Sequence, residues 1–279
     1  MLSYLHAFHA GNFADVQKHA TLYLALTRMQ AKASPIACFD THAGSAVYDL
    51  KGERALKTGE SDRGIQRLWQ NRAGLQSDDW QGFMAELETW NGVIPELRHY
   101  PGSPAWMATL SRDQDLVAAF ELHSTEGLRL EAWAEGRKLK VRRENGLAGL
   151  LHSLPPSAPR LLALMDPSYE IRKDYQEVAE TLVKAWRKCR HGVFLIWYPI
   201  LPDRLHRKLL EALVNSPVTK VLQSELSLVT PPDRGMRGSG MLVVNPPWGL
   251  GDRLEAMMAE VGGPEGLNAS HRLDWLVPE

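Results

Sequence analysis

The chain has 279 residues, 44% of them hydrophobic and 9 of them Trp, which is enough to build one large α/β domain. No apolar run approaches the roughly 20 residues that span a bilayer, and the first residues lack the pattern of a secretory signal, so we expect a cytoplasmic protein without membrane contact. The formal net charge of −1 argues against a strongly basic nucleic-acid binder, and the two distant cysteines, Cys38 and Cys189, argue against a disulfide framework.

The first third of the chain predicts a helix, a strand and a helical insertion. Residues 15–32 have the apolar spacing of an amphipathic helix, and residues 36–40 form a short buried strand that the small-residue turn 41–45 follows. Residues 47–98 are more polar, keep a helical period and contain no convincing strand. We therefore predict a core domain of residues 1–46 and 99–279, with residues 47–98 as an inserted helical subdomain.

The remainder of the chain predicts strands in alternation with helices. A turn at 100–104 opens a helix, and strands follow at 116–122, 139–142, 161–165 and 192–198, with helical patterns at 128–135 and 174–188 between them. Residues 221–229 and 240–245 look like a closing antiparallel pair. Because such alternation produces right-handed crossovers, we predict an α/β fold with a doubly wound, seven-stranded sheet.

Polar residues stand at the ends of four predicted strands, namely Asp40, Glu121, Asn145 and Asp166. Ligands of parallel sheets bind at these ends, so the set predicts a nucleotide-like cofactor whose ribose Glu121 would hold and whose adenine Asn145 would contact. A nicotinamide dehydrogenase fits less well. The turn 41–45 is not the Gly-x-Gly-x-x-Gly fingerprint, and Glu121 follows Asp40 by about 80 residues where about 20 are expected.

The turn Asp166-Pro167-Ser168-Tyr169 follows the strand 161–165. The Asp166 carboxylate and the Pro167 carbonyl can accept the two hydrogens of an exocyclic base amine, while Tyr169 offers a flat surface for stacking. This combination favours methylation of a base nitrogen. Residues 245–248, Asn-Pro-Pro-Trp, match the same pattern, but they follow the last core strand, so we interpret them as a tight turn at the sheet edge.

Several further blocks occur in a fixed order over nearly the full length: HAFHAGNFADVQKH, DTHAG, YPGSP, FELH, DPSYE, WYP, SGM, NPPW and WLVPE. With them the chain resembles the RlmJ family, which methylates N6 of an adenine in bacterial 23S ribosomal RNA. The resemblance implies a class I, Rossmann-like methyltransferase fold, S-adenosyl-L-methionine as cofactor and S-adenosyl-L-homocysteine as product. It also implies 23S ribosomal RNA as partner and an adenine of the position-2030 type as target. We expect a monomer.

The resemblance also implies a role for single residues. Lys18, His19, His42 and Ser103 would lie near the methionine end of the cofactor, Glu121 at its ribose, Asn145 and Gly146 at its adenine end, Asp166, Pro167 and Tyr169 at the reacting centre, and Tyr4 against the RNA. Three residues depart from the family pattern. Ser168 stands for a second proline, Asn145 for an Asp, and Leu5 for an Arg.

Several alternatives remain open at this point. A DNA adenine-N6 methyltransferase would share the chemistry, and the Ser168 change is compatible with an inactive RNA-binding relative. The histidines at 6, 9, 19 and 42 lack a carboxylate or cysteine to complete a metal site in the sequence, so we predict no metal. The basic segments 137–143, 187–191 and 204–208, together with Arg234 and Arg237, are either RNA contacts or ordinary solvated surface.

Overall fold

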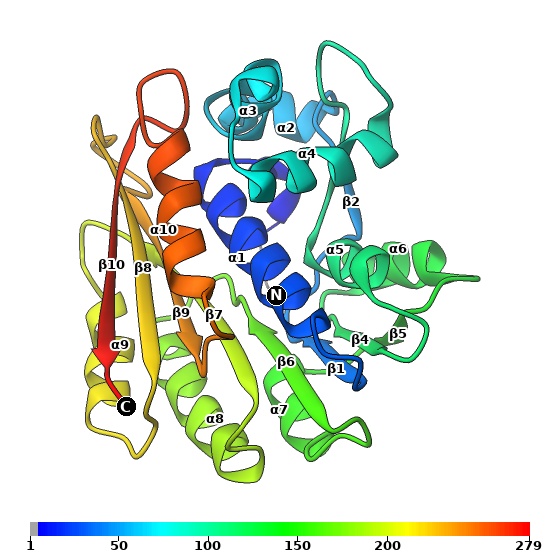
Figure 1. Cartoon of the computed structure of the whole chain (residues 1–279), viewed down its shortest axis with the longest axis vertical. Coiled ribbons are helices and arrows are strands. Elements are labelled where there is room, and N and C mark those ends of the chain that lie inside the picture. The colour runs from blue at the N-terminus through cyan, green and yellow to red at the C-terminus, as the bar shows by residue number, and fades with distance from the viewer. Residues whose placement is uncertain (1–4) are drawn as a thin grey trace.

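A computed structural model describes residues 5–279 and contains an eight-stranded central sheet (Figure 1). Its strands are β1 (Ile36–Asp40), β4 (Leu116–Phe120), β5 (Lys140–Arg142), β6 (Arg160–Met165), β7 (Val193–Ile200), β8 (Val221–Leu228), β9 (Gly238–Val244) and β10 (Ala269–Val277). The strand order is β10-β8-β9-β7-β6-β1-β4-β5. The five strands from β7 to β5 run parallel, and β9, β8 and β10 complete the sheet in antiparallel pairs.

Helices cover both faces of this sheet (Figure 1). The α-helices are α1 (Phe13–Gln30), α2 (Glu53–Thr58), α3 (Ile65–Gln70), α4 (Asp78–Asn91), α5 (Ser103–Leu110), α6 (Ser124–Ala134), α7 (Gly146–His152), α8 (Asp174–Lys188), α9 (His206–Val214) and α10 (Leu250–Val261). Short 3-10 helices are η1 (His6–Phe8), η2 (Glu60–Arg63) and η3 (Arg72–Gly74). A separate two-stranded sheet joins β2 (Val47–Asp49) to β3 (His99–Pro101).

The alternation of side chains along the strands divides the apolar core into two clusters. In β6, Leu162 and Leu164 belong to the cluster that contains α1, α5 and α10. Leu161, Ala163 and Met165 belong to the cluster of α7, α8 and α9 on the other face. Since neighbouring residues of a strand point to opposite faces, a strand covered on both sides reads as an unbroken apolar run.

The helix α1 is buried almost all round because the sheet lies on one side of it and α4 and α5 pack on others. Asn12 caps its first turn by accepting a hydrogen bond from the Asp15 amide at 2.9 Å. The charged residues Asp15 and Lys18 are only 2% and 4% exposed. Buried charges require partners, so the burial of these two residues in α1 predicts that they take part in an ion-pair network.

Two features of the fold differ from the expectation. The sheet has eight strands where we expected seven, because β10 adds an edge strand of mainly exposed and half-buried residues in place of a buried apolar run. Residues 47–98 contain β2, although no strand was expected there. The helices of this segment also share an apolar cluster with α1 and α5. The Phe83 ring, for example, stacks on the Trp106 ring of α5 at 4.5 Å between centroids.

None of the helices within residues 5–279 has the length and apolar character needed to cross a bilayer.

Candidate active site

The carboxyl ends of β1, β4, β6 and β7 open into one pocket of about 800 Å³. This volume lies within the usual range for small-molecule sites, about 300–1,000 Å³. Five residues that the sequence marked as cofactor neighbours line it together with Asp166: Lys18, His19, His42, Ser103 and Glu121. They come from α1, the turn after β1, the start of α5 and the end of β4. The strand order β6-β1-β4 therefore gathers residues that are up to about 150 positions apart.

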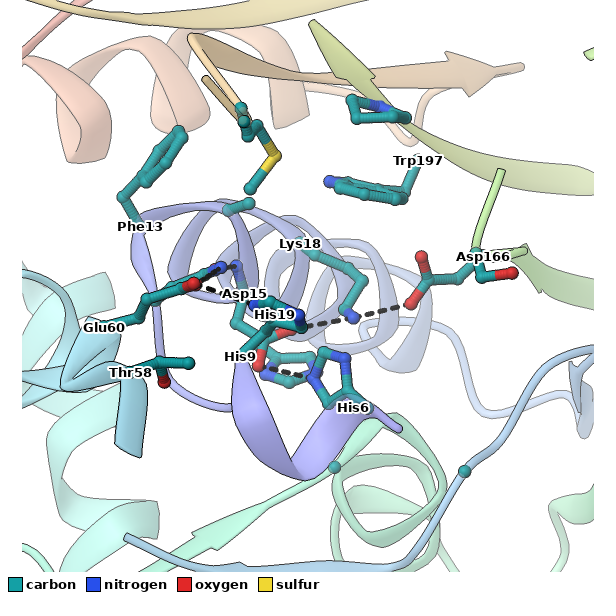
Figure 2. A pocket seen from close by; sticks show the side chains of 18 of the residues that line it. His6, His9, Phe13, Asp15, Lys18, His19, Thr58, Glu60, Asp166 and Trp197 are labelled. Atoms are coloured by element: carbon teal, nitrogen blue, oxygen red, sulfur yellow. Dashed lines mark hydrogen bonds and ion pairs between the residues drawn. The ribbon is translucent and has the colours of Figure 1, made fainter. Parts of the chain in front are cut away.

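Asp166 directly follows β6, and its carboxylate points toward α1 (Figure 2). The Lys18 ammonium lies 2.6 Å from Asp166 Oδ2 and 2.8 Å from Asp15 Oδ1, so one cation bridges two carboxylates. Asp166 is 13% exposed at its side chain, whereas Lys18 and Asp15 are 5% and 2% exposed. The carboxylate of Asp166 is thus the member of this group that faces the pocket.

Two opposing effects act on the pKa of Asp166, namely burial and the neighbouring Lys18 ammonium. Burial raises the pKa of Asp166 above its ordinary value, and the neighbouring Lys18 limits that rise by favouring the carboxylate. Burial alone would lower the pKa of Lys18, but the two carboxylates outweigh it and raise that pKa, so Lys18 stays charged. Burial likewise opposes ionisation of Asp15, yet His6 and Lys18 bring its pKa well below the ordinary value.

Asp15 and Glu60 extend the network away from Asp166 (Figure 2). Asp15 Oδ2 lies 2.7 Å from His6 Nε2 and accepts the Gly11 amide at 2.8 Å. Glu60 Oε1 lies 2.8 Å from His9 Nδ1, and Glu60 Oε2 accepts a hydrogen bond from the side-chain amide of Asn12 at 2.9 Å. These contacts tie η1 and the segment 47–98 to the first turn of α1.

Glu121 is arranged as an acceptor for a ligand with hydroxyl groups. Its Oε2 accepts the Gly44 amide at 2.6 Å and its Oε1 accepts the His123 amide at 2.6 Å. Each carboxylate oxygen keeps a further lone pair, and the partly exposed side chain lines the pocket. Gly44 adopts φ +59°, a left-handed conformation that favours glycine, which brings its N–H to the carboxylate. The residues present therefore fit the ribose of a nucleoside cofactor.

His19 and His42 add polar groups at the other wall of the pocket. The Nδ1 atom of His19 lies 2.8 Å from the Tyr100 hydroxyl, while its buried Nε2 atom has no hydrogen-bond partner within residues 5–279. An orphaned ring nitrogen on a pocket wall suits a polar ligand group. Burial lowers the pKa of His42 to about 4, so this imidazole is neutral at pH 7. Ser103 lies close enough to Asp40, at the tip of β1, to limit the rise in pKa that burial causes in that carboxyl group.

Tyr169 is buried, at 6% exposure, and is not among the described residues that line the pocket. Its ring stacks on Tyr175 at 4.4 Å between centroids, and its hydroxyl donates to the Trp197 carbonyl at 2.7 Å. Pro167, Ser168 and Trp197 do line the pocket. Stacking of Tyr169 on a base therefore stays a prediction. The partly exposed Trp197 ring, fixed by its Nε1 donating to Ser239 Oγ at 2.9 Å, is an aromatic surface that the sequence did not single out.

Asn145 and Gly146 form the start of α7 beside the turn after β1. The Asn145 side chain caps this helix by accepting the Ala148 amide at 3.0 Å, and Gly146 packs so tightly that an added Cβ would lie 1.7 Å from the Thr41 carbonyl oxygen. Among the described residues that line the pocket, neither of the two occurs. Their contact with an adenine ring stays a prediction.

Two further sequence features have a clear place. Asn245 follows β9 and donates its side-chain amide to the Arg190 and Gly192 carbonyls, both at 2.8 Å. Because β9 runs antiparallel to β7, this turn lies where the parallel strands begin, at the opposite end from Asp166. It is not at the sheet edge where we expected it, since β9 is an inner strand. Tyr4 lies outside the described residues. Within residues 5–279, no three His, Cys, Asp or Glu side chains gather in a way that could hold a metal ion.

Sequence reasoning did not identify Asp15 and Glu60 as parts of the site. Asp15 and Lys18 are three positions apart, a spacing that places them on one face of a helix and so signals a pair. No comparable signal links Glu60 to His9, because 51 positions separate them and only the fold brings them together.

Comparisons with known proteins identify the family of this chain. The family model described as "Ribosomal RNA large subunit methyltransferase D, RlmJ" matches residues 33–277. The chain belongs to the RlmJ family. It is 36% identical to ribosomal RNA large subunit methyltransferase J of Escherichia coli (strain K12) over 291 aligned positions, and both proteins are covered completely.

Two further relatives support the same family. The enzyme of the same name from Haemophilus influenzae is 34% identical to this chain, again over the whole of both. A crystal structure of a Legionella pneumophila protein superposes with a TM-score of 0.88 at 30% identity, over 96% of this chain and 98% of that one. The RlmJ-family chain thus shares its whole fold with a solved structure.

Proposed function

We propose that this RlmJ-family protein methylates N6 of an adenine in 23S ribosomal RNA, of the position-2030 type, with S-adenosyl-L-methionine as methyl donor. The observation that carries the proposal is the Asp166 carboxylate, which lines the pocket and pairs with the Lys18 ammonium at 2.6 Å, in a chain of this family. Ribosomal RNA as substrate implies action in the cytoplasm, and we propose that the protein acts there as a monomer.

Asp166 has one free oxygen for the substrate. Lys18 occupies Oδ2, which leaves Oδ1 to accept one hydrogen of the adenine N6 amine, while the Pro167 carbonyl accepts the other. Two such hydrogen bonds orient the amine and make its lone pair less delocalised. Positioning of this kind can contribute about 7–11 kcal/mol in favourable cases. Once N6 carries a positive charge, loss of its proton is easy, and Asp166 is the nearest acceptor.

S-adenosyl-L-methionine supplies an electrophilic methyl group bound to a sulfonium. In this proposal Glu121 holds the ribose hydroxyls, and the neutral His19 and His42 face the methionine end. Lys18 uses two of its three N–H donors on Asp15 and Asp166, so in this proposal it holds Asp166 in place and keeps one donor for the methionine end of the cofactor. Asn145 and Gly146 would contact the adenine ring of the cofactor.

An adenine within a duplex cannot reach Asp166, so the target base must be unpaired or flipped out. We propose that residues 47–98 form part of the RNA surface. Arg63 of η2 and Arg234 of the loop between β8 and β9 are both exposed, and they line the same pocket as Asp166 from two sides. Their cations would hold the phosphates next to the flipped nucleotide.

The direct test is methyl transfer to protein-free 23S RNA with labelled cofactor, followed by nuclease digestion and mass spectrometry. We expect N6-methyladenosine at one site, and no comparable label on duplex DNA. Preferential labelling of DNA would favour the DNA enzyme, and cofactor binding without transfer to any RNA would favour an inactive relative. Either result would overturn the proposal.

A further inference from the structure

A second cavity, of about 640 Å³, lies outside the reaction pocket between α8 and α9. These helices pack side by side on one face of the sheet (Figure 1). The groove is strongly basic although the whole chain has a net charge of −1. Its charged lining consists of five cations and one acid: Arg172, Lys173, Lys184, Arg187, Lys208 and Glu180.

Most of these cations have no partner of their own. Lys173 pairs with Glu177 at 2.8 Å, and Glu180 accepts a hydrogen bond from Gln176 at 2.9 Å. For Arg172, Lys184, Arg187 and Lys208, residues 5–279 offer no ion pair, and all four side chains are exposed. Five cations against one acid in a single groove give it a positive potential that four unpaired side chains leave uncompensated, and such a potential attracts an anionic ligand.

The residues contributed by α8 follow a helical stripe. Residues 173, 176, 180, 184 and 187 are spaced by three or four positions, so they lie along one face of the helix over about 21 Å. The floor of the groove is small and apolar, formed by Ala179, Val183 and Ala212. A long, narrow channel with charged walls fits an extended polyanion better than a compact ligand.

The groove also connects to the reacting centre. Its first cations, Arg172 and Lys173, follow Asp166 by only six and seven residues. Tyr169 stacks on Tyr175 in the first turn of α8, which fixes the loop that carries Asp166 to this helix. A strand of RNA that places one base at Asp166 would therefore reach the upper end of the groove with its neighbouring backbone.

We propose that the groove between α8 and α9 binds the phosphate backbone of the RNA substrate beyond the methylated nucleotide. This inference rests on the proposed function for the identity of the polyanion. The recognition would be electrostatic and independent of base sequence, because lysine and arginine side chains on helix surfaces contact phosphates without reading bases.

The test compares the double variant Lys184→Glu with Arg187→Glu against Lys32→Glu, an exposed cation just after α1, which covers the opposite face of the sheet from α8. Binding of protein-free 23S RNA is measured by filter retention at several salt concentrations. At ~0.1 M salt we expect roughly 10- to 100-fold weaker binding for the double variant, with a salt slope lower by about 1 to 2. The affinity for S-adenosyl-L-homocysteine should not change, and Lys32→Glu should alter RNA binding by less than about twofold.

Unchanged RNA affinity and salt slope in the double variant would overturn the inference. A second contradictory result is that polyglutamate binds the wild type but not the double variant, while both bind RNA equally well. That result would assign the groove to an acidic protein partner. Filter retention does not depend on methyl transfer. A wild-type protein that binds RNA through the groove but fails to methylate it would refute the proposed reaction alone.

Discussion

Replacement of Lys18 by Met tests whether one buried cation holds the reacting carboxylate in its charged form. Met keeps most of the length of the side chain and removes the charge between Asp15 and Asp166, at 2.8 and 2.6 Å. Asp15 retains His6 and the Gly11 amide, so the uncompensated charge falls mainly on Asp166. Removing one member of a buried ion pair typically costs about 3–5 kcal/mol, and we expect a loss of that size in the free energy of unfolding at pH 8.

The stability cost of Lys18→Met should depend on pH, because the charge of Asp166 does. Without Lys18, burial raises the pKa of Asp166 further above its unfolded value, so the stability it contributes is present at low pH and lost as the pH rises through that pKa. The cost of Lys18→Met should therefore be smaller at pH 5 than at pH 8. Methyl transfer needs the carboxylate, so the acidic limb of the rate profile should move to higher pH.

Urea unfolding at pH 5 and pH 8 measures this difference. Lys51→Met is the matched control, because it removes an exposed pair with Glu96 and should have little effect at either pH. Adding Asp166→Asn to Lys18→Met should recover part of the lost stability, since the carboxylate that lost its partner is then neutral. A loss below about 1 kcal/mol that does not vary with pH would refute the role given to Lys18.

Three further predictions concern other parts of the molecule. Burial raises the pKa of Asp40 to about 7, so the stability that its protonated form contributes is lost as the pH rises from about 4 through about 7. Asp40→Asn should remove that loss and so raise the free energy of unfolding at pH 8 by up to about 4 kcal/mol, which urea unfolding measures. Glu121→Gln should weaken S-adenosyl-L-homocysteine binding about 10- to 100-fold in calorimetry, since a charged acceptor contributes about 1.5–3 kcal/mol. Phe83→Ala should cost about 3–5 kcal/mol in one cooperative unfolding transition, because this fully buried ring joins α4 to α5. A separate transition for residues 47–98 would contradict the shared core.

The sequence predicted the parallel core well because most of its strands, all but β5, are runs of mainly apolar residues. The expected strands 36–40 and 161–165 agree with β1 and β6 to within one residue, and the expected helix 174–188 coincides with α8. The edge strand β10 has a mostly exposed pattern that carries little apolar signal, and β2 and β3 are only three residues long. Such elements form because a neighbour pairs with them, which no local pattern records.

The site shows the same division between local and long-range information. Asp166 and Glu121 could be found because each follows the end of a strand, and the strand order places those ends on either side of β1. The hydrogen bond of Tyr169 to Trp197 and the pairing of Glu60 with His9 depend on how distant segments pack. Those contacts decide which groups face the pocket, and only the folded chain reveals them.

The central claim is that the Asp166 carboxylate orients the amine that receives the methyl group. Its most direct test is single-turnover methyl transfer to 23S RNA by Asp166→Asn, which keeps the size of the side chain and one acceptor oxygen but removes the charge. We expect the rate to fall by at least about 100-fold, with S-adenosyl-L-homocysteine and RNA still bound as in the wild type. A rate within about twofold of the wild type would contradict the claim.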